Sequence, residues 1–262
     1  MLTSAYPYAV DPADLPAMLW TAHGGQAAGT ALARVLAGDV SPAGRLPQTW
    51  YADDADLPDL LDYDVIGGRQ TYLYFEGTPL FPFGHGLSYG AFSYGELTAG
   101  VDGSAVRVSF TVTNSGDVTA DEVPQLYVRA VDPSVPRPRR ELLAHRRVGP
   151  APGETVELSF VLPLSAFAFW DVAVGRWRVE PGAYELLAGA SSEDVRSRVT
   201  LTLDGEPAAP VRWPNAVWTG PTSTSRAVSR SSTGPGRRAT RSRPWAGRRV
   251  NSSSAAATSV PG

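Results

Sequence analysis

The sequence contains no cysteine, no lysine and no long apolar run. Without cysteine the chain can form neither a disulfide framework nor a thiolate metal site, a composition compatible with any cellular compartment. No run approaches the roughly 20 apolar residues of a membrane helix, so we expect no membrane partner. Residues 1–10 are too short and too uncharged to be a secretory signal. The signal of an exported longer parent would precede Met1, and localisation stays open.

The basic residues, all of them arginine, are unevenly distributed. Up to Val211 the acids outnumber the arginines, whereas the chain from Arg212 onward contains neither aspartate nor glutamate. Residues 207–262 also lack hydrophobic periodicity, so we expect a disordered tail. A basic tail with tryptophan could bind nucleic acid or an anionic polymer. The abrupt loss of every acid instead favours a GC-rich reading frame translated out of phase, and we expect no nucleic-acid partner.

An aromatic stretch rich in glycine and proline spans residues 67–92 and reads GGRQTYLYFEGTPLFPFGHGLSYGAF. Two-residue alternation over residues 71–75 predicts a short strand. Pro79, Pro82, Gly84 and Gly86 then predict a fixed loop. We interpret the stretch as a joint that packs aromatic rings between two bodies. An aromatic core edge without a joint role is the alternative.

The first 50 residues combine one predicted strand with two predicted helices. Residues 1–10 predict a strand and residues 12–20 a helix. A second helix is predicted because apolar residues recur at three- and four-residue spacing before Gly38 ends the pattern. The apolar stripe consists of Ala28, Ala31, Leu32, Val35 and Leu36. This stripe requires a larger sheet than residues 1–50 provide, so we expect exposed apolar surface.

Residues 95–206 carry the clearest strand periodicity of the chain. About seven short strands separated by turns predict an immunoglobulin-like or fibronectin III-like β-sandwich without a disulfide. The apolar positions lie in residues 106–112, 123–128, 142–148, 156–162, 177–179, 184–188 and 199–203. We expect the Pro/Arg loop 131–140 to dock on the preceding domain, residues 149–154 to form a hairpin connection, and residues 167–170 to anchor the core.

Several ordered motifs resemble the C-terminal portion of glycoside hydrolase family 3, the β-glucosidases and β-xylosidases. One is a helix motif that runs on into the sequence SPAGRLPQTW, and the others are TYLYF and PLFPFGHGLSYGAF. The matching positions are Gly25, Gln26, Gly29, Ala31, Ala33, Val35, Leu36, Gly38, Asp39, Ser41, Pro42, Gly44, Arg45, Leu46, Pro47, Thr49, Trp50, Thr71, Tyr72, Tyr74, Phe75 and residues 79–92. The region up to Leu203 is similar to the family's fibronectin type III-like module.

This resemblance implies an α+β multidomain fragment with four parts. Residues 1–50 would be the C-terminal remnant of the family's α/β sandwich domain, residues 51–94 a linker and aromatic interdomain joint, residues 95–206 the fibronectin type III-like β-sandwich, and residues 207–262 a disordered tail. Family members usually carry a nucleophilic aspartate on a preceding barrel and an acid/base glutamate on the α/β sandwich. The chain is expected to begin after both carboxylates.

The resemblance implies the C-terminal part of a retaining, exo-acting β-glycosidase that is inactive alone and needs no cofactor. Its partners would be the missing barrel domain and, in the parent, a β-linked oligosaccharide or glycoside. The acids within residues 53–64 are interpreted as a solvated linker, since a charge run without an apolar pocket is usually solvated. A non-catalytic β-sandwich module that binds a polysaccharide or a partner domain is the alternative function.

Candidate site residues are few. We predict no catalytic residue, no cofactor site and no metal site, because His23 and His145 lack partners at ligand spacing and residues 24–26 lack a phosphate-binding motif. His85 is the one candidate for a sugar contact, against a structural role in its loop. Arg45 and Asp39 are interpreted as a structural ion pair or as turn anchors.

Overall fold

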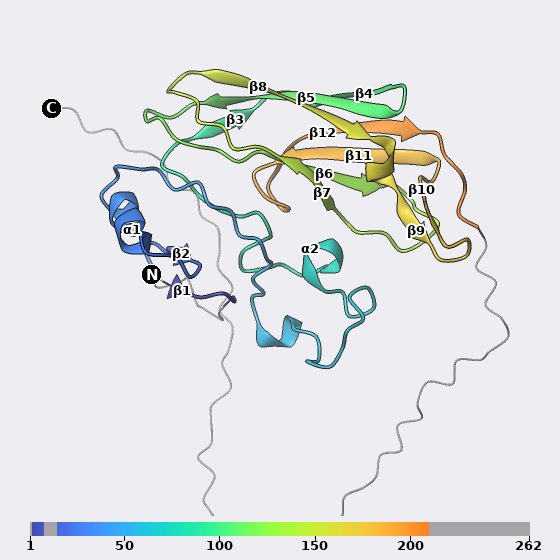
Figure 1. Ribbon diagram of the computed structural model, residues 1–262, viewed down its shortest axis with the longest axis horizontal. Coiled ribbons are helices and arrows are strands. Elements are labelled where there is room, and N and C mark those ends of the chain that lie inside the picture. Colours follow the sequence, from blue (N-terminus) through green and yellow to red (C-terminus); the bar gives the residue numbers. More distant parts are fainter. Residues whose placement is uncertain (1, 8–14, 210–262) are drawn as a thin grey trace, which may run out of the picture. The chain divides into compact units, whose positions relative to one another are not determined.

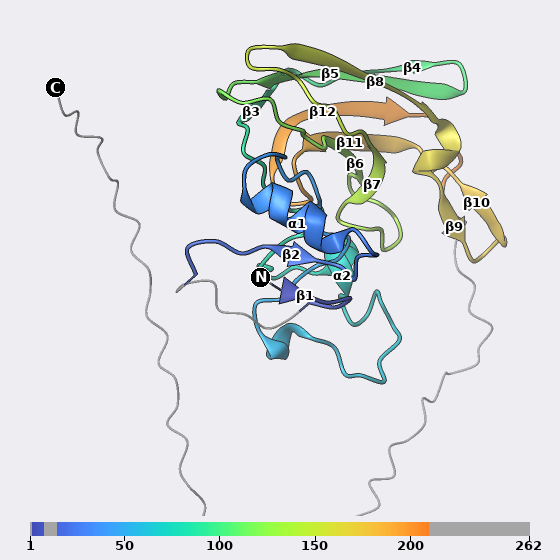
Figure 2. The ribbon, with the colours of Figure 1, turned by 60° about the vertical axis from the view of Figure 1, so that its left-hand side comes forward.

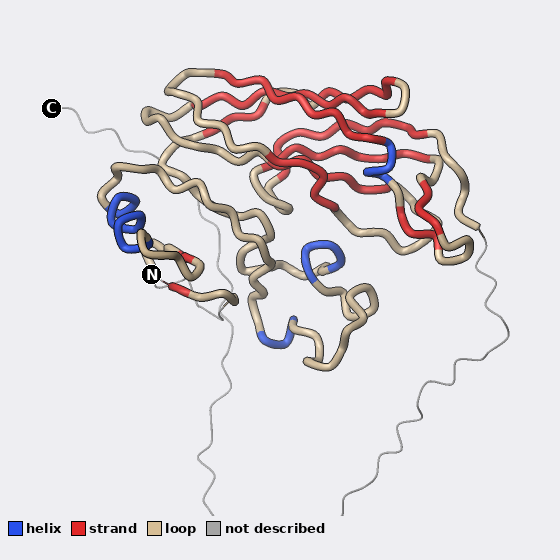
Figure 3. Tube along the Cα trace, viewed as in Figure 1, coloured by secondary structure: helices blue, strands red, loops and turns tan. Residues whose placement is uncertain are grey.

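A computed structural model describes residues 2–7 and 15–209. The chain divides into two units, residues 1–213 and 214–262, and the second lies entirely outside the described residues. Of the tail predicted to be disordered, residues 207–262, residues 210–262 also lie outside the described residues. The described part is mostly β-structure with few helices, as Figure 3 shows. Within it, no helix is long and apolar enough to cross a membrane.

The first sheet of the β-sandwich is built around β5 (Ala105–Asn114). β3 (Phe92–Tyr94) and β4 (Thr98–Asp102) pair with β5 along one edge, and β8 (Thr155–Pro163) pairs with it along the other, all antiparallel. Alternate residues of β5 are buried because successive side chains of a strand point to opposite faces. The sequence predicted β5 and β8; it did not predict β3 and β4.

The second sheet has the strand order β12-β11-β6-β7. It contains β6 (Gln125–Ala130), β7 (Glu141–His145), β11 (Gly182–Gly189) and β12 (Val195–Leu203), paired antiparallel. Figure 1 shows the two sheets as layers. Residues 149–154 were predicted to form a hairpin connection, and this was wrong, because they lead from β7 in one sheet to β8 in the other.

One hydrophobic core lies between the two sheets. Val106, Val108, Phe110 and Val112 of β5 contribute one side of it, and apolar residues of β6, β11 and β12 the other. Phe167, in the 3₁₀-helix η2 (Leu164–Phe167), closes the core with its ring 5.6 Å from that of Tyr184. The predicted fibronectin III-like sandwich is confirmed, and it buries this core without a disulfide.

A separate two-stranded hairpin consists of β9 (Phe169–Asp171) and β10 (Arg176–Arg178). In Figures 1 and 2 it stands at the edge of the sandwich, outside both sheets. The prediction of core positions here was only partly right: Phe169 is buried, but Trp170 is 50 % and Trp177 66 % exposed. Strand alternation identifies which residues share a face, and it does not identify which face the protein covers.

The segments before the sandwich contain little regular structure. β1 (Leu2–Thr3) and β2 (Trp20–Thr21) form a two-stranded parallel sheet, and α1 (Ala28–Leu36) is the predicted second helix, followed by Gly38 in the left-handed conformation. The predicted helix over residues 12–20 is wrong in its described part, which contains no helix. Residues 8–14, where the rest of that helix and of the first strand would lie, are outside the described residues.

Residues 71–75 were predicted to form a strand, and the structure instead has the short helix α2 (Thr71–Tyr74). Alternation over so few residues does not separate a strand from a single helical turn. The 3₁₀-helix η1 (Asp54–Asp56) is the other regular element of this part. The domain boundaries at residues 50, 94 and 206 remain predictions.

Candidate functional site

The joint predicted for residues 67–92 contacts both the preceding segment and the sandwich. Residues 46–50 exchange backbone hydrogen bonds with residues 81–85, including Leu46 N–H to His85 O at 2.8 Å and Trp50 N–H to Phe81 O at 2.9 Å. On the other side, Ser192 N–H donates to Phe83 O at 2.9 Å. The joint loop is therefore held between two parts of the chain that are far apart in sequence.

Aromatic rings pack throughout this joint. Tyr72 stacks on Phe83 with ring centroids 4.0 Å apart, and it meets Tyr127 in β6 in an edge arrangement with ring centroids 6.3 Å apart. Trp50, 1 % exposed, contacts Phe81 at 5.9 Å in an edge arrangement. Such edge and stacked pairs contribute roughly 0.5–1.5 kcal/mol each beyond area burial. These contacts fit the joint interpretation, which remains a prediction beside the alternative of a core edge.

A buried polar cluster around Gln125 fixes the tip of the loop to the second sheet. The Gln125 amide donates to Gly84 O at 3.0 Å and to Ala190 O at 2.8 Å, and the Tyr127 hydroxyl donates to Gln125 Oε1 at 2.5 Å. Burial is the main cause that raises the pKa of Tyr127, and the neighbouring Tyr72 raises this pKa further. The Tyr127 hydroxyl therefore stays protonated and acts as a hydrogen-bond donor. Gly84 has φ +80°, and a Cβ at this position would collide with Gln125 Oε1. Glycine is therefore required here.

Arg45 forms a buried ion pair with Glu122 at 2.6 Å, and both side chains are less than 10 % exposed. The interpretation of Arg45 as a structural ion-pair residue is confirmed, but its partner is Glu122, 77 positions away, rather than Asp39. The sequence did not indicate Glu122, because the pairing is long-range. Removing one partner of such a pair leaves an uncompensated buried charge.

The Pro/Arg loop 131–140 contacts α2, which precedes the sandwich, as predicted, and it also contacts the second sheet and the turn after β11. Arg139 N–H donates to Leu73 O at 2.7 Å, and its guanidinium donates to Phe75 O just after α2. Arg140 donates to Ser192 O and pairs with Glu193 at 2.9 Å. Arg137 lies over the Phe169 ring at 5.1 Å. The contacts of these arginines fix the loop against other parts of the same chain.

His85 lies partly buried in the joint loop, with its ring stacked on Phe81 at 5.2 Å. Burial, and then the charge of Arg45, lowers the pKa of His85 below its ordinary value of 6.5. The imidazole is therefore neutral at pH 7 and can both donate and accept a hydrogen bond. Its proposed sugar contact remains a prediction, and its geometry fits a packed loop residue.

The acids of residues 53–64 are occupied with local turns. Carboxylates of Asp53, Asp59, Asp62 and Asp64 accept backbone N–H groups two or three residues onward. All four residues are exposed. Among the described residues, no group of three or more His, Asp or Glu side chains could hold a metal ion.

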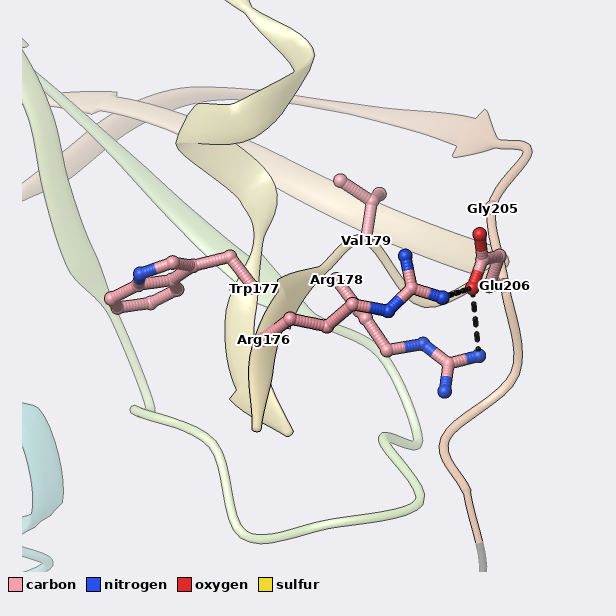
Figure 4. Close-up of a pocket in the computed structure, with 6 residues that line it drawn as sticks. All are labelled: Arg176, Trp177, Arg178, Val179, Gly205 and Glu206. Atoms are coloured by element: carbon pink, nitrogen blue, oxygen red, sulfur yellow. Dashed lines mark hydrogen bonds and ion pairs between the residues drawn. The ribbon is translucent and has the colours of Figure 1, made fainter. Parts of the chain in front are cut away.

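A cavity of about 210 Å³ lies beside β10, as Figure 4 shows. Its lining includes Arg176, Arg178 and Glu206, whose carboxylate pairs with both guanidinium groups at 2.5 and 3.2 Å. Only one carboxylate lines this cavity, whereas retaining glycoside hydrolysis needs two about 5 Å apart. The cavity does not have the composition of a family active site.

Two family profiles match the chain. The glycosyl hydrolase family 3 C-terminal domain matches residues 1–89, and the fibronectin type III-like domain matches residues 122–192. Similar proteins include the xylan 1,4-beta-xylosidase of Xylanibacter ruminicola, 41 % identical over 68 % of this chain and 21 % of that protein. The thermostable beta-glucosidase B of Acetivibrio thermocellus is 38 % identical over 66 % of this chain and 25 % of that protein.

Solved structures show the same relationship. The GH3 beta-glucosidase of Bifidobacterium adolescentis is 35 % identical with a TM-score of 0.64, over 74 % of this chain and 30 % of that one. The beta-glucosidase of Kluyveromyces marxianus in complex with glucose is 32 % identical with a TM-score of 0.66, over 71 % and 24 %. The chain thus spans less than a third of the length of these relatives. Together with the fold, these matches identify the chain as the C-terminal portion of a glycoside hydrolase family 3 protein, with a fibronectin type III-like domain.

Proposed function

We propose that this chain is the structural C-terminal portion of a retaining, exo-acting β-glycosidase and is not itself the catalyst. The observation that carries the proposal is the buried Arg45–Glu122 pair, which joins the segment matched to the family 3 C-terminal domain to the sandwich. A buried pair of this kind fixes orientation more than it adds net stability. The sandwich would thus fix the orientation of the segment matched to the family 3 C-terminal domain, residues 1–89.

The described residues favour a scaffold over a catalyst. The acids of residues 53–64 are exposed, and their carboxylates accept bonds from their own backbone. A retaining glycosidase instead requires a nucleophile and an acid/base about 5 Å apart, with the acid's pKa raised by its surroundings. Glu141 is a partly buried carboxyl whose pKa burial raises, but its neighbours are tyrosines and Arg137 rather than a second carboxylate. The nucleophile and acid/base are therefore proposed to come from another part of the parent protein.

The first experiment assays the full 262-residue chain on aryl β-glucoside and aryl β-xyloside. We expect no release of the aryl alcohol above the buffer rate. Hydrolysis that survives purification and follows the protein would overturn the scaffold proposal.

The second experiment sequences and translates, in all three frames, the DNA that precedes the Met1 codon. We expect a barrel with a nucleophilic aspartate and a loop with the acid/base glutamate. The upstream segment and this chain, expressed together, should hydrolyse one of the two glycosides. An unrelated upstream sequence would contradict the β-glycosidase assignment and leave a structural or binding module.

A further inference from the structure

The hairpin β9–β10 presents two tryptophans on one exposed face. Trp170 and Trp177 are paired across the two strands, with ring centroids 5.7 Å apart in an edge arrangement. They are 50 % and 66 % exposed, and Val172 and Val174 in the connecting turn are exposed as well. Contiguous exposed apolar side chains often mark an interaction site, so this face is a candidate for one.

The opposite side of the hairpin is firmly held. Asp171 is 3 % exposed, pairs with Arg178 at 3.1 Å and accepts N–H groups from Ala173 and Ala209 at 2.9 and 3.1 Å. Figure 4 shows Trp177 pointing away from Arg176 and Arg178, which bind Glu206 on the other side of the strand. The buried Asp171–Arg178 pair thus fixes the hairpin that carries the two tryptophans. Ligand binding would therefore cost little conformational entropy for ordering these side chains.

The size of the face limits what can bind. An aromatic side chain buries about 150–250 Å², so the exposed fractions of the two rings leave on the order of 250 Å² together, to which the exposed parts of Val172 and Val174 add a smaller area. A stable protein partner requires about 800 Å² per side. The face is therefore too small for a lasting protein interface and matches a ligand of one or two rings.

The chemistry selects a ligand with a flat apolar face and polar edges. The indole rings offer π-faces for stacking, whereas the charged Arg176 and Glu206 side chains lie on the opposite side of β10 and pair with each other there. A pyranose ring in a β-linked chain has axial C–H groups on its faces and hydroxyl groups around its edge. Its C–H face can stack on the indole rings while its hydroxyl groups stay in contact with water.

We propose that Trp170 and Trp177 form a surface platform that stacks on pyranose rings of a β-linked oligosaccharide, separate from any catalytic centre. The choice of a β-linked saccharide rests on the proposed function, whereas the platform itself rests on the geometry of the hairpin. Such a site would keep the protein on a saccharide chain while another part of the parent acts on its end.

The test is titration calorimetry of the full chain with xylohexaose and with cellohexaose. We compare wild type with Trp177→Ala, Trp170→Ala and the double variant, and with Tyr63→Ala as a matched loss of an exposed aromatic that is 85 % exposed. We expect wild type and Tyr63→Ala to bind at least one hexaose equally. Trp177→Ala should weaken binding about ten-fold, and the double variant should abolish it. Equal melting temperatures would show that the variants are folded.

Failure of wild type to bind either hexaose would overturn the platform, and so would equal binding by the double variant. Self-association that disappears in the double variant, without hexaose binding, would also overturn it and assign the face to a second copy. The measurement needs no hydrolysis. If the chain binds a hexaose but the upstream DNA encodes no catalytic segment, the platform proposal stands and only the β-glycosidase proposal fails. The failure of one proposal can therefore be distinguished from the failure of the other.

Discussion

The sandwich and the segments before it are stabilised in different ways. The sandwich buries its own core of alternating strand residues between two sheets. By contrast, α1 contains no buried residue, and Leu36 is 69 % exposed. β1 and β2 form a parallel sheet of two strands. Parallel sheets are normally larger and have both faces covered by other elements. The expected exposed apolar surface is confirmed. The sandwich is organised by local periodicity, and the preceding segments depend on long-range contacts with it.

The largest effect should come from breaking the sandwich core. Phe110→Ala removes a ring that is 2 % exposed and is expected to cost about 3–5 kcal/mol of unfolding free energy, because a cavity remains. Chemical denaturation monitored by far-UV circular dichroism measures this loss. Val161→Ala, on the exposed face of β8, is the control and should change little. Equal stability of the Phe110 variant would refute the assignment of one continuous core.

The buried ion pair tests whether the preceding segments depend on the sandwich. Glu122→Gln leaves Arg45 buried without its counter-charge and should cost about 3 kcal/mol. Hydrogen exchange should show the loss first in residues 41–50 and 81–85. Arg107→Ala, which breaks the exposed Arg107–Asp102 pair, should cost less than about 1 kcal/mol. Uniform loss of protection across the sandwich would contradict the division between the two regions.

Glycine replacement separates backbone strain from close packing at the joint. Gly84→Ala should cost about 1–2 kcal/mol for the left-handed backbone and more for the collision with Gln125. Gly153 has φ +76° with open space around a Cβ, so Gly153→Ala measures the backbone term alone. Thermal melts of the two variants give the difference. A Gly84 variant no less stable than the Gly153 variant would show that the Gln125 contact is not tight.

The smallest effect is a pH dependence of the joint. The pKa of His85 is lowered in the folded state, so the unfolded chain binds a proton more readily. The stability contribution of neutral His85 is therefore present above its ordinary value of 6.5 and is lost as the pH falls below it. Melting curves from pH 7.5 to 5 should show this loss, and His85→Gln should reduce it. His145→Gln, at the exposed end of β7, is the control; an identical pH profile for His85→Gln would refute the assignment.

The strand pattern of the sandwich was predictable because burial on one face imposes a two-residue period that is visible locally. The same rule failed at residues 71–75, where Thr71 adopts φ +60° and Arg139, 64 positions away from Phe75, holds the end of the helical turn. The two-residue period also placed Trp177 on a strand, but it did not indicate that the Trp177 side chain is exposed to solvent. Periodicity describes neighbours along the chain; it cannot describe which distant segment covers a face.

The sequence by itself determined the family resemblance, the main strands of the sandwich, the helix α1 and the aromatic composition of the joint, since each is encoded in adjacent residues. Tertiary structure alone decided that Arg45 pairs with Glu122, that Gln125 requires Gly84, and that Trp170 and Trp177 share an exposed face. Those features depend on contacts between residues far apart in sequence. Such contacts are fixed only when the sheets pack and buried polar groups must find partners.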